Sequence, residues 1–192
     1  MKHVADRFVV ILDANVLYPF RTRDALLRFA EAGLFRARWS RDILDEWRRS
    51  LLANRPELQA SIESQMAAME KAFPEGCVEG YQDLIEALSL PDPDDRHVLA
   101  AAIVADAEHI VTENMKDFPA EALSKYGVEA VTSDDFLAST FELYPAEATV
   151  AMRNMRRSYD KPAMSAPEFI FDLQTKGLPK TASMLKPHVD VI

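Results

Sequence analysis

The 192-residue chain contains one cysteine, Cys77, and only five glycines. A single thiol excludes a disulfide framework within the chain, and a chain of this length can bury a hydrophobic core without such cross-links. No apolar run approaches the ~20 residues that span a bilayer. The N-terminus also lacks the basic, apolar and small-residue order of a signal peptide. We therefore expect a cytoplasmic protein that does not associate with membranes.

Several motifs that identify large enzyme classes are missing. The sequence has no GxxxxGK[ST] or GxGxxG phosphate loop and no GxSxG nucleophile motif, which disfavours nucleotide-fuelled enzymes and serine hydrolases. The histidines are scattered without the spacing of zinc ligands, at His3, His97, His109 and His188. His97 lies near an acidic cluster, where we expect a single histidine to be structural or on the surface.

Positive charge is also in short supply, since 22 Lys and Arg face 31 Asp and Glu for a formal net charge of -9. This balance disfavours nucleic-acid binding through bulk charge. The basic residues are nevertheless clustered. Arginines crowd residues 21–55, and a second group consists of Arg153, Arg156, Arg157 and Lys161. An acidic centre flanked by basic patches suits a metal enzyme that acts on a polyanion.

Strand and helix patterns alternate along most of the chain. Residues 8–12 form a continuous apolar run that ends at Asp13, as is typical of a central parallel strand buried on both faces. Further short strands are expected at residues 35–39, 109–112 and 128–131. Helices are expected at residues 23–32, 41–53, 56–73, 93–105, 120–126 and 132–141, with residues 81–89 left open. The sequence therefore predicts an α/β fold with an open, mostly parallel sheet.

The character of the chain changes after Pro145, beyond which only helices are expected. The first covers residues 146–157, and the second begins at Ser165, which forms a capping-box pattern with Glu168. The sequence thus predicts a core domain of residues 1–144 and a helical C-terminal extension of residues 145–192. The apolar stripes of these helices need a surface to cover, which we expect to be the chain's own domain; a partner's groove is the alternative.

Carboxylates occur at positions where a site could form. Asp13 and Asn15 follow the first strand, and Glu46 lies at the border of the apolar stripe of its helix. Ligands of open parallel sheets bind beyond the carboxyl ends of the strands. The polar segment from Thr112 to Asp117 follows a later strand, so we expect it to meet Asp13 at the same edge.

A denser acidic cluster, Asp92, Asp94 and Asp95, opens a helix. Helix starts stabilise acids through free amides and the helix dipole, which accounts for Asp92. Three neighbouring acids repel one another unless a positive charge lies among them. Oxygen ligands of this kind suit Mg²⁺ or Mn²⁺.

Four stretches resemble the PIN-domain family, and within it the VapC-type toxin ribonucleases: residues 10–17, 40–46, 90–103 and 110–118. The resemblance implies a three-layer α/β/α fold with a mostly parallel central sheet. By position, it implies catalytic acids at Asp13, Glu46, Asp95 and Asp117, with Asp13, Asp95 and Asp117 as metal ligands. It also implies polar supports at Asn15, Thr112 and Asn114. Asn114 departs from the family, because many relatives carry an acid there.

The same resemblance implies an activity and partners. These are endonucleolytic cleavage of single-stranded RNA with Mg²⁺ or Mn²⁺, a homodimer, and inhibition by a small antitoxin protein. Three other functions compete. A phosphoacceptor signalling domain needs an acidic pair after the first strand, and a DxD phosphatase needs a second acid where Asn15 stands. A binding module on the same fold without catalysis remains open, because Asn114 weakens the acidic set.

Overall fold

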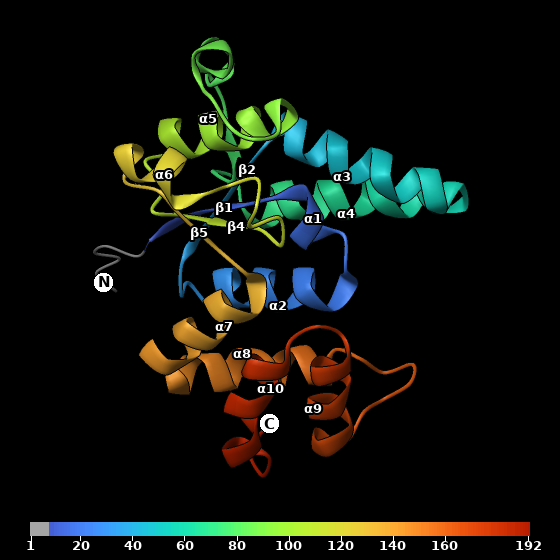
Figure 1. Ribbon diagram of the computed structural model, residues 1–192. Helices are drawn as coiled ribbons and strands as arrows, with labels where there is room; N and C mark the ends of the chain where they lie inside the picture. Colours follow the sequence, from blue (N-terminus) through green and yellow to red (C-terminus); the bar gives the residue numbers. More distant parts are fainter. Residues whose placement is uncertain (1–7) are drawn as a thin grey trace. The chain divides into compact units, whose positions relative to one another are not determined.

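A parallel sheet forms the centre of the first part of the molecule in the computed structural model, which describes residues 8–192 (Figure 1). Its strands run in the order β3-β2-β1-β4-β5, and every pairing is parallel. They are β1 (Val9–Leu12), β2 (Arg36–Ser40), β3 (Cys77–Val78), β4 (His109–Val111) and β5 (Glu129–Val131). The predicted α/β class with a mostly parallel sheet is confirmed.

The strand order gives the sheet a switch point next to β1, where successive strands are added first on one side of β1 and later on the other. From β1 the chain continues to β2 on one side, and it later returns to β4 on the other side. The backbone N–H of Asp13 donates to the carbonyl of Val111 at 3.1 Å, which continues the β1–β4 pairing past the end of β1. Ligands of open parallel sheets bind at such a switch point. Asp13 and the segment after β4 therefore occupy the place where a site is expected.

Five helices accompany this sheet, and each follows from local sequence. They are α1 (Ala14–Leu17), α3 (Arg41–Asn54), α4 (Gln59–Ala72), α5 (Arg96–Val104) and α6 (Ala120–Leu123), joined in part by short 3-10 segments. The Ser40 hydroxyl accepts from the N–H of Ile43 at 3.2 Å and caps α3, as predicted. Val98 and Leu99 in α5 are fully buried, and α5 packs on β1, β2 and β4.

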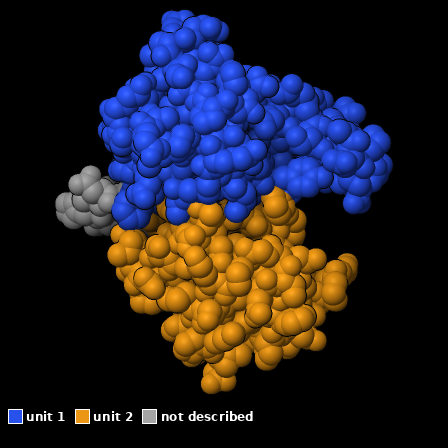
Figure 2. Space-filling model, viewed as in Figure 1, with its two compact units in different colours: residues 1–18, 35–131 blue, residues 19–34, 132–192 orange. Residues whose placement is uncertain are grey.

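The remaining helices form a second compact unit (Figure 2). It consists of α2 (Phe20–Glu31), α7 (Ser133–Leu143), α8 (Pro145–Arg157), α9 (Ala166–Thr175) and α10 (Pro179–Leu185), followed by the 3-10 segment Lys186–His188. Within it α8 packs against α2 and α7, and α10 packs against α7 and α9. The sequence-based boundary at residue 145 falls inside this unit, because α2 and α7 associate with the C-terminal helices.

The C-terminal helices bury their apolar stripes within this unit. Phe169 and Leu173 of α9 are fully buried, and Ser165 and Glu168 form the predicted capping box. Two apolar residues of these helices are exposed, Val150 of α8 at 43% and Phe171 of α9 at 66%, whereas Met152 and Met155 of α8 are fully buried. Among residues 8–192, no helix has both the length and the apolar character that crossing a bilayer requires.

Candidate active site

Asp13 is fixed at the carboxyl end of β1, where it also caps α1. It is 2% exposed. Its Oδ1 accepts from the N–H of Ala14 at 2.7 Å. Its Oδ2 accepts from Asn15 Nδ2 at 2.6 Å and from the Thr112 hydroxyl at 2.7 Å. Burial raises the pKa of the Asp13 carboxyl above its ordinary value, while the hydrogen bond from Thr112 acts in the opposite direction.

Asn15 joins the end of β1 to the segment after β4. Its Nδ2 donates to Thr112 Oγ1 at 2.9 Å as well as to Asp13, and its Oδ1 accepts from the N–H of Glu113 at 3.0 Å. The N–H of Asn114 also donates to Thr112 Oγ1, at 3.0 Å. An aspartate in place of Asn15 would set a second carboxylate against Asp13. Asn15 instead donates to Asp13 and Thr112, so the second acid of a DxD phosphatase is missing here.

Asp95 lies in the 3-10 turn Pro93–Asp95 that leads into α5. Its pKa rises to about 7, first because the side chain is partly buried and then because of the negative charges of Asp13, Asp92, Asp117 and Glu46. These acids come from β1, α3, the start of α5 and the loop after β4. Acids from four separate segments thus share one electrostatic environment at the switch point of the sheet.

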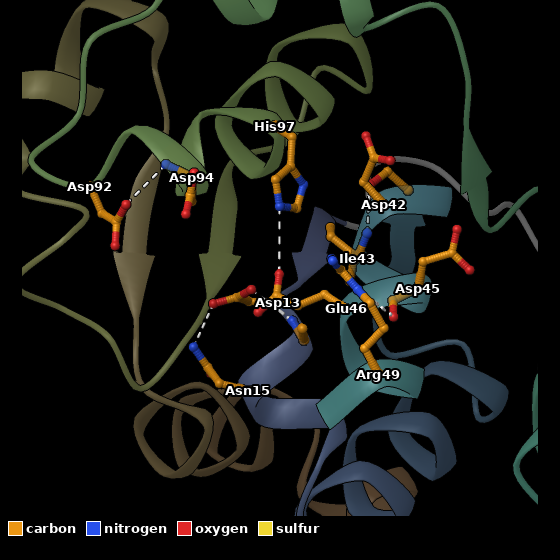
Figure 3. A network of polar contacts seen from close by, with 12 residues as sticks. Asp13, Asn15, Asp42, Ile43, Asp45, Glu46, Arg49, Asp92, Asp94 and His97 are labelled. Carbon is orange, nitrogen blue, oxygen red and sulfur yellow. Dashed lines mark hydrogen bonds and ion pairs between the residues drawn. The ribbon is translucent and has the colours of Figure 1, made fainter. Parts of the chain in front are cut away.

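A cleft of about 770 Å³ opens beside these acids. Glu46 and His97 are neighbours in its wall, and their Oε2 and Nε2 atoms are 3.5 Å apart (Figure 3). The lining residues come from α3, the start of α5 and the loop after β4: Asp42, Glu46, Arg49, Ser50, Ala53, Asp92, Asp94, Asp95, His97 and Asn114. An open, largely acidic cleft of this kind favours a bound cation together with a ligand that reaches it from solvent.

Some of the predicted site residues line the cleft, and others lie outside its lining. Glu46, Asp95 and Asn114 line the cleft, whereas Asp13 is buried and Asp117 contributes its negative charge. As the side chains stand, no three carboxylate, imidazole or thiol groups of residues 8–192 are gathered closely enough to surround an ion. The donor chemistry still fits a hard divalent cation, because carboxylate oxygens that repel one another are stabilised by one.

Several residues of this cleft were not predicted from the sequence, among them Asp42, His97 and Arg49. His97, expected to be structural or on the surface, faces Glu46 in the cleft wall. Arg49 was counted only among the clustered arginines, yet it also lines the cleft. The available signal was spacing: residues three apart share a helix face, and Arg49 follows Glu46 at that distance.

Comparisons with known proteins agree with this geometry. A family model described as "PIN domain" matches residues 9–116, more than half of the chain, and one described as "VapC50 C-terminal domain" matches residues 133–187. A relative from Mycobacterium tuberculosis, "Putative ribonuclease VapC50", is 38% identical over 104 residues, which are 54% of this chain and 60% of the relative. The match thus spans less than two thirds of that relative. None of the solved structures matches the chain significantly.

The PIN match includes β1, α3 and α5, and with them Asp13, Glu46 and Asp95. Asp117 lies one residue past its end. The parallel central sheet with helices, followed by further helices, is the fold that the resemblance implied. The chain belongs to the PIN-domain family.

Proposed function

We propose that this protein is an endoribonuclease that cleaves single-stranded RNA with Mg²⁺ or Mn²⁺, and that it is the toxin of a toxin–antitoxin pair. The observation that carries the proposal is the grouping of acids at the carboxyl edge of the sheet: Asp13 follows β1, and Glu46 and Asp95 line the cleft beside it. The raised pKa of Asp95, caused first by partial burial and then by its acidic neighbours, supports it. Carboxylates this close repel one another when all are ionised, and a divalent cation bound among them would offset that repulsion. The name of the Mycobacterium relative supports the ribonuclease assignment.

Asp13, Asp95 and Asp117 are the residues that would hold the cation. When bound, the cation supplies positive charge that makes a water molecule a stronger nucleophile and offsets the charge that builds on the phosphate. Asp13 can contribute through Oδ1. That oxygen accepts one hydrogen bond, from Ala14, whereas Oδ2 accepts two, from Asn15 and Thr112. A carboxylate oxygen has about two lone-pair sites, so Oδ1 retains one.

The other polar residues position this acid and its neighbours. Asn15 and Thr112 prevent the Asp13 carboxylate from rotating, because each donates to the same oxygen. The His97 ring, 3.5 Å from Glu46, restricts where that carboxylate points. Glu46 is therefore held at the cleft wall, where it can accept a proton from a water molecule that attacks a bound phosphodiester.

The partners belong to the same proposal. We expect a small antitoxin protein that inhibits the enzyme, and a homodimer in solution. Co-expression with the product of an adjacent reading frame, followed by purification on one tagged chain, tests the first. Light scattering of the pure chain tests the second.

The activity is tested with purified protein and a fluorogenic single-stranded RNA. Cleavage is expected with Mg²⁺ or Mn²⁺ and is expected to stop when a chelator is added. Asp13→Asn should lower the rate at least ~100-fold, the scale on which removal of a group that stabilises the transition state acts. The matched control is Asp45→Asn on α3, an exposed acid paired with Arg41 at 3.7 Å, which should stay within about twofold of the wild type.

A second candidate, the binding module without catalysis, is supported by Asn114, which lines the cleft where many relatives carry an acid. It predicts RNA binding with no cleavage in any divalent metal. Full activity of Asp13→Asn in a preparation free of contaminating nuclease, or cleavage that continues in excess chelator, contradicts the metal-dependent enzyme.

A further inference from the structure

One wall of the acidic cleft is formed by a single face of α3. Glu46, Arg49, Ser50 and Ala53 all line the cleft, and their spacing of three, four and seven residues places them on one side of a helix. This face leads away from the acidic centre toward the C-terminal end of α3. Because Ser50 and Ala53 are small, they leave open space beyond Arg49.

Arg49 is the cation of this wall. Apart from His97, the other charged residues that line the cleft are carboxylates. Its Nε donates to the backbone carbonyl of Asp45 at 3.3 Å. Among residues 8–192, no carboxylate lies within ion-pair distance of its guanidinium. A guanidinium has five N–H donors, so Arg49 keeps most of its donors for a ligand in the cleft.

The neighbouring arginines of the same helix are engaged elsewhere. Arg48 Nη2 lies 3.8 Å from Glu63 of α4. Arg41 lies 3.7 Å from Asp45 and 3.5 Å from Glu70. Arg41 and Arg48 thus each have a carboxylate partner, whereas Arg49, which lines the acidic cleft, has none within ion-pair distance among the described residues.

An exposed aromatic ring from α1 lies beside the C-terminal end of α3. Tyr18, at the C-terminal end of α1, is 38% exposed, and its hydroxyl accepts from Asn54 Nδ2 at 3.3 Å. Asn54 follows Ala53 directly, and α1 packs against α3. The Tyr18 ring is thus held near the outer end of the face on which Arg49 lies. Exposed rings of this kind stack on the bases of single-stranded nucleic acids.

We propose that this face of α3 binds the substrate strand, with Arg49 holding a backbone phosphate next to the one that is cleaved and Tyr18 stacking on a base farther along. The proposal rests on the proposed ribonuclease function and extends it to substrate recognition. The acidic cleft repels a phosphate backbone wherever no cation intervenes. A guanidinium binds phosphate through paired, charge-assisted hydrogen bonds, so Arg49 supplies attraction beyond the metal.

The test measures binding separately from cleavage. A short, fluorescein-labelled oligouridylate is titrated with the full chain, with Ca²⁺ in place of Mg²⁺ to suppress cleavage, and fluorescence anisotropy is recorded at several salt concentrations. Arg49→Gln should bind about tenfold more weakly, and the slope of log affinity against log salt should fall by ~0.7, the value for one phosphate contact to a single strand. Tyr18→Leu should also weaken binding about tenfold, with little change in the salt slope.

Arg48→Gln is the matched control, because it removes the same charge from the adjacent position of the same helix. It should bind within about twofold of the wild type, and all three variants should melt as the wild type does. In Mn²⁺, Arg49→Gln should raise KM and leave kcat nearly unchanged, since the contact is made before and during the reaction alike.

Each outcome decides between the two proposals. If Arg49→Gln keeps the affinity and salt slope of the wild type while RNA is still cleaved, the α3 surface is wrong and the ribonuclease stands. If the wild type binds without cleaving and Arg49→Gln weakens binding, the surface stands and the enzyme assignment falls. If the wild type neither binds nor cleaves RNA, both fall. Unchanged binding by Tyr18→Leu overturns the stacking contact.

Discussion

Partial burial, and then the negative charges of its acidic neighbours, raise the pKa of Asp95, and this sets how the metal-free protein responds to pH. Its pKa of about 7 lies above the ordinary value of 3.8, so the folded protein holds a proton that the unfolded chain releases. The stabilising effect of that proton is fully present below pH 3.8 and is lost as the pH rises through about 7. Burial also raises the pKa of Asp13, which adds an effect of the same sign.

We therefore expect the metal-free wild type to melt at a lower temperature at pH 8 than at pH 5. Asp95→Asn should flatten this dependence and raise Tm at pH 8 by a few degrees, corresponding to about 1 kcal/mol after allowance for solvent screening. Thermal denaturation in chelator, followed by circular dichroism, measures both effects. Asp94→Asn in the same turn is the control and should melt as the wild type does. An Asp95→Asn protein that melts at or below the wild type at pH 8 would exclude this account.

The hydrogen bonds between the residues that follow β1 and those that follow β4 could be predicted from the sequence only in part. Asp13 was predicted to stand at the end of a buried strand, and the segment from Thr112 to Asp117 was predicted to follow another. The hydrogen bonds from Asn15 to Thr112 and from Thr112 to Asp13 join positions about a hundred residues apart. No local pattern encodes such a pairing; it follows from the strand order, which places β4 beside β1.

At the scale of single elements, α7 and α10 are joined by a buried carboxylate. Asp134 in the first turn of α7 is 8% exposed. It accepts from the backbone N–H groups of Lys180 and Thr181, at 2.8 and 2.9 Å, and from the Thr181 hydroxyl at 2.8 Å. These amides begin α10 and have no partner within that helix. The loss of the carboxylate would leave buried donors unsatisfied.

Asp134→Ala should therefore lower the free energy of unfolding by about 2–4 kcal/mol. The adjacent Asp135 provides the control, because its carboxylate pairs with Lys180 at the exposed surface, and Asp135→Ala should cost less than about 1 kcal/mol. Urea denaturation of both variants gives the comparison. Equal losses in the two variants would mean that α10 is held by its apolar contacts alone.

Elements with strong local signals were predicted well, and those without such signals were not. Ser40 and Ser165 cap their helices as predicted, because capping depends on residues within one turn. The strand β3, Cys77–Val78, was missed, since two residues show no periodicity. Helix α2 begins at Phe20 and not at the predicted Arg23, directly after the fixed backbone of Pro19.

At the scale of the whole chain, the second unit is assembled from two separated segments. Residues 19–34 and 132–192 cluster together, so a helix near the N-terminus shares its core with the C-terminal helices. A boundary predicted from composition divides the chain at one point. It cannot reveal that residues 19–34, which are distant in sequence, pack with the C-terminal helices. The division at residue 145 falls between α7 and α8, beyond the last strand, β5, and its meaning for folding is open to a direct test.

Removal of residues 145–192 should destabilise what remains. Helices α2 and α7 lose α8 and α10, against which they pack, so apolar side chains at these contacts become exposed. Phe141, now 1% exposed, also loses its ring contact with His188. Each such side chain is worth about 1.5–3 kcal/mol when buried, which is large against the total stability of a protein. We expect residues 1–144 to bind a hydrophobic dye, to melt at a much lower temperature and to aggregate. A truncated chain that stays monodisperse and melts as the full protein does would establish residue 145 as the start of an independent extension.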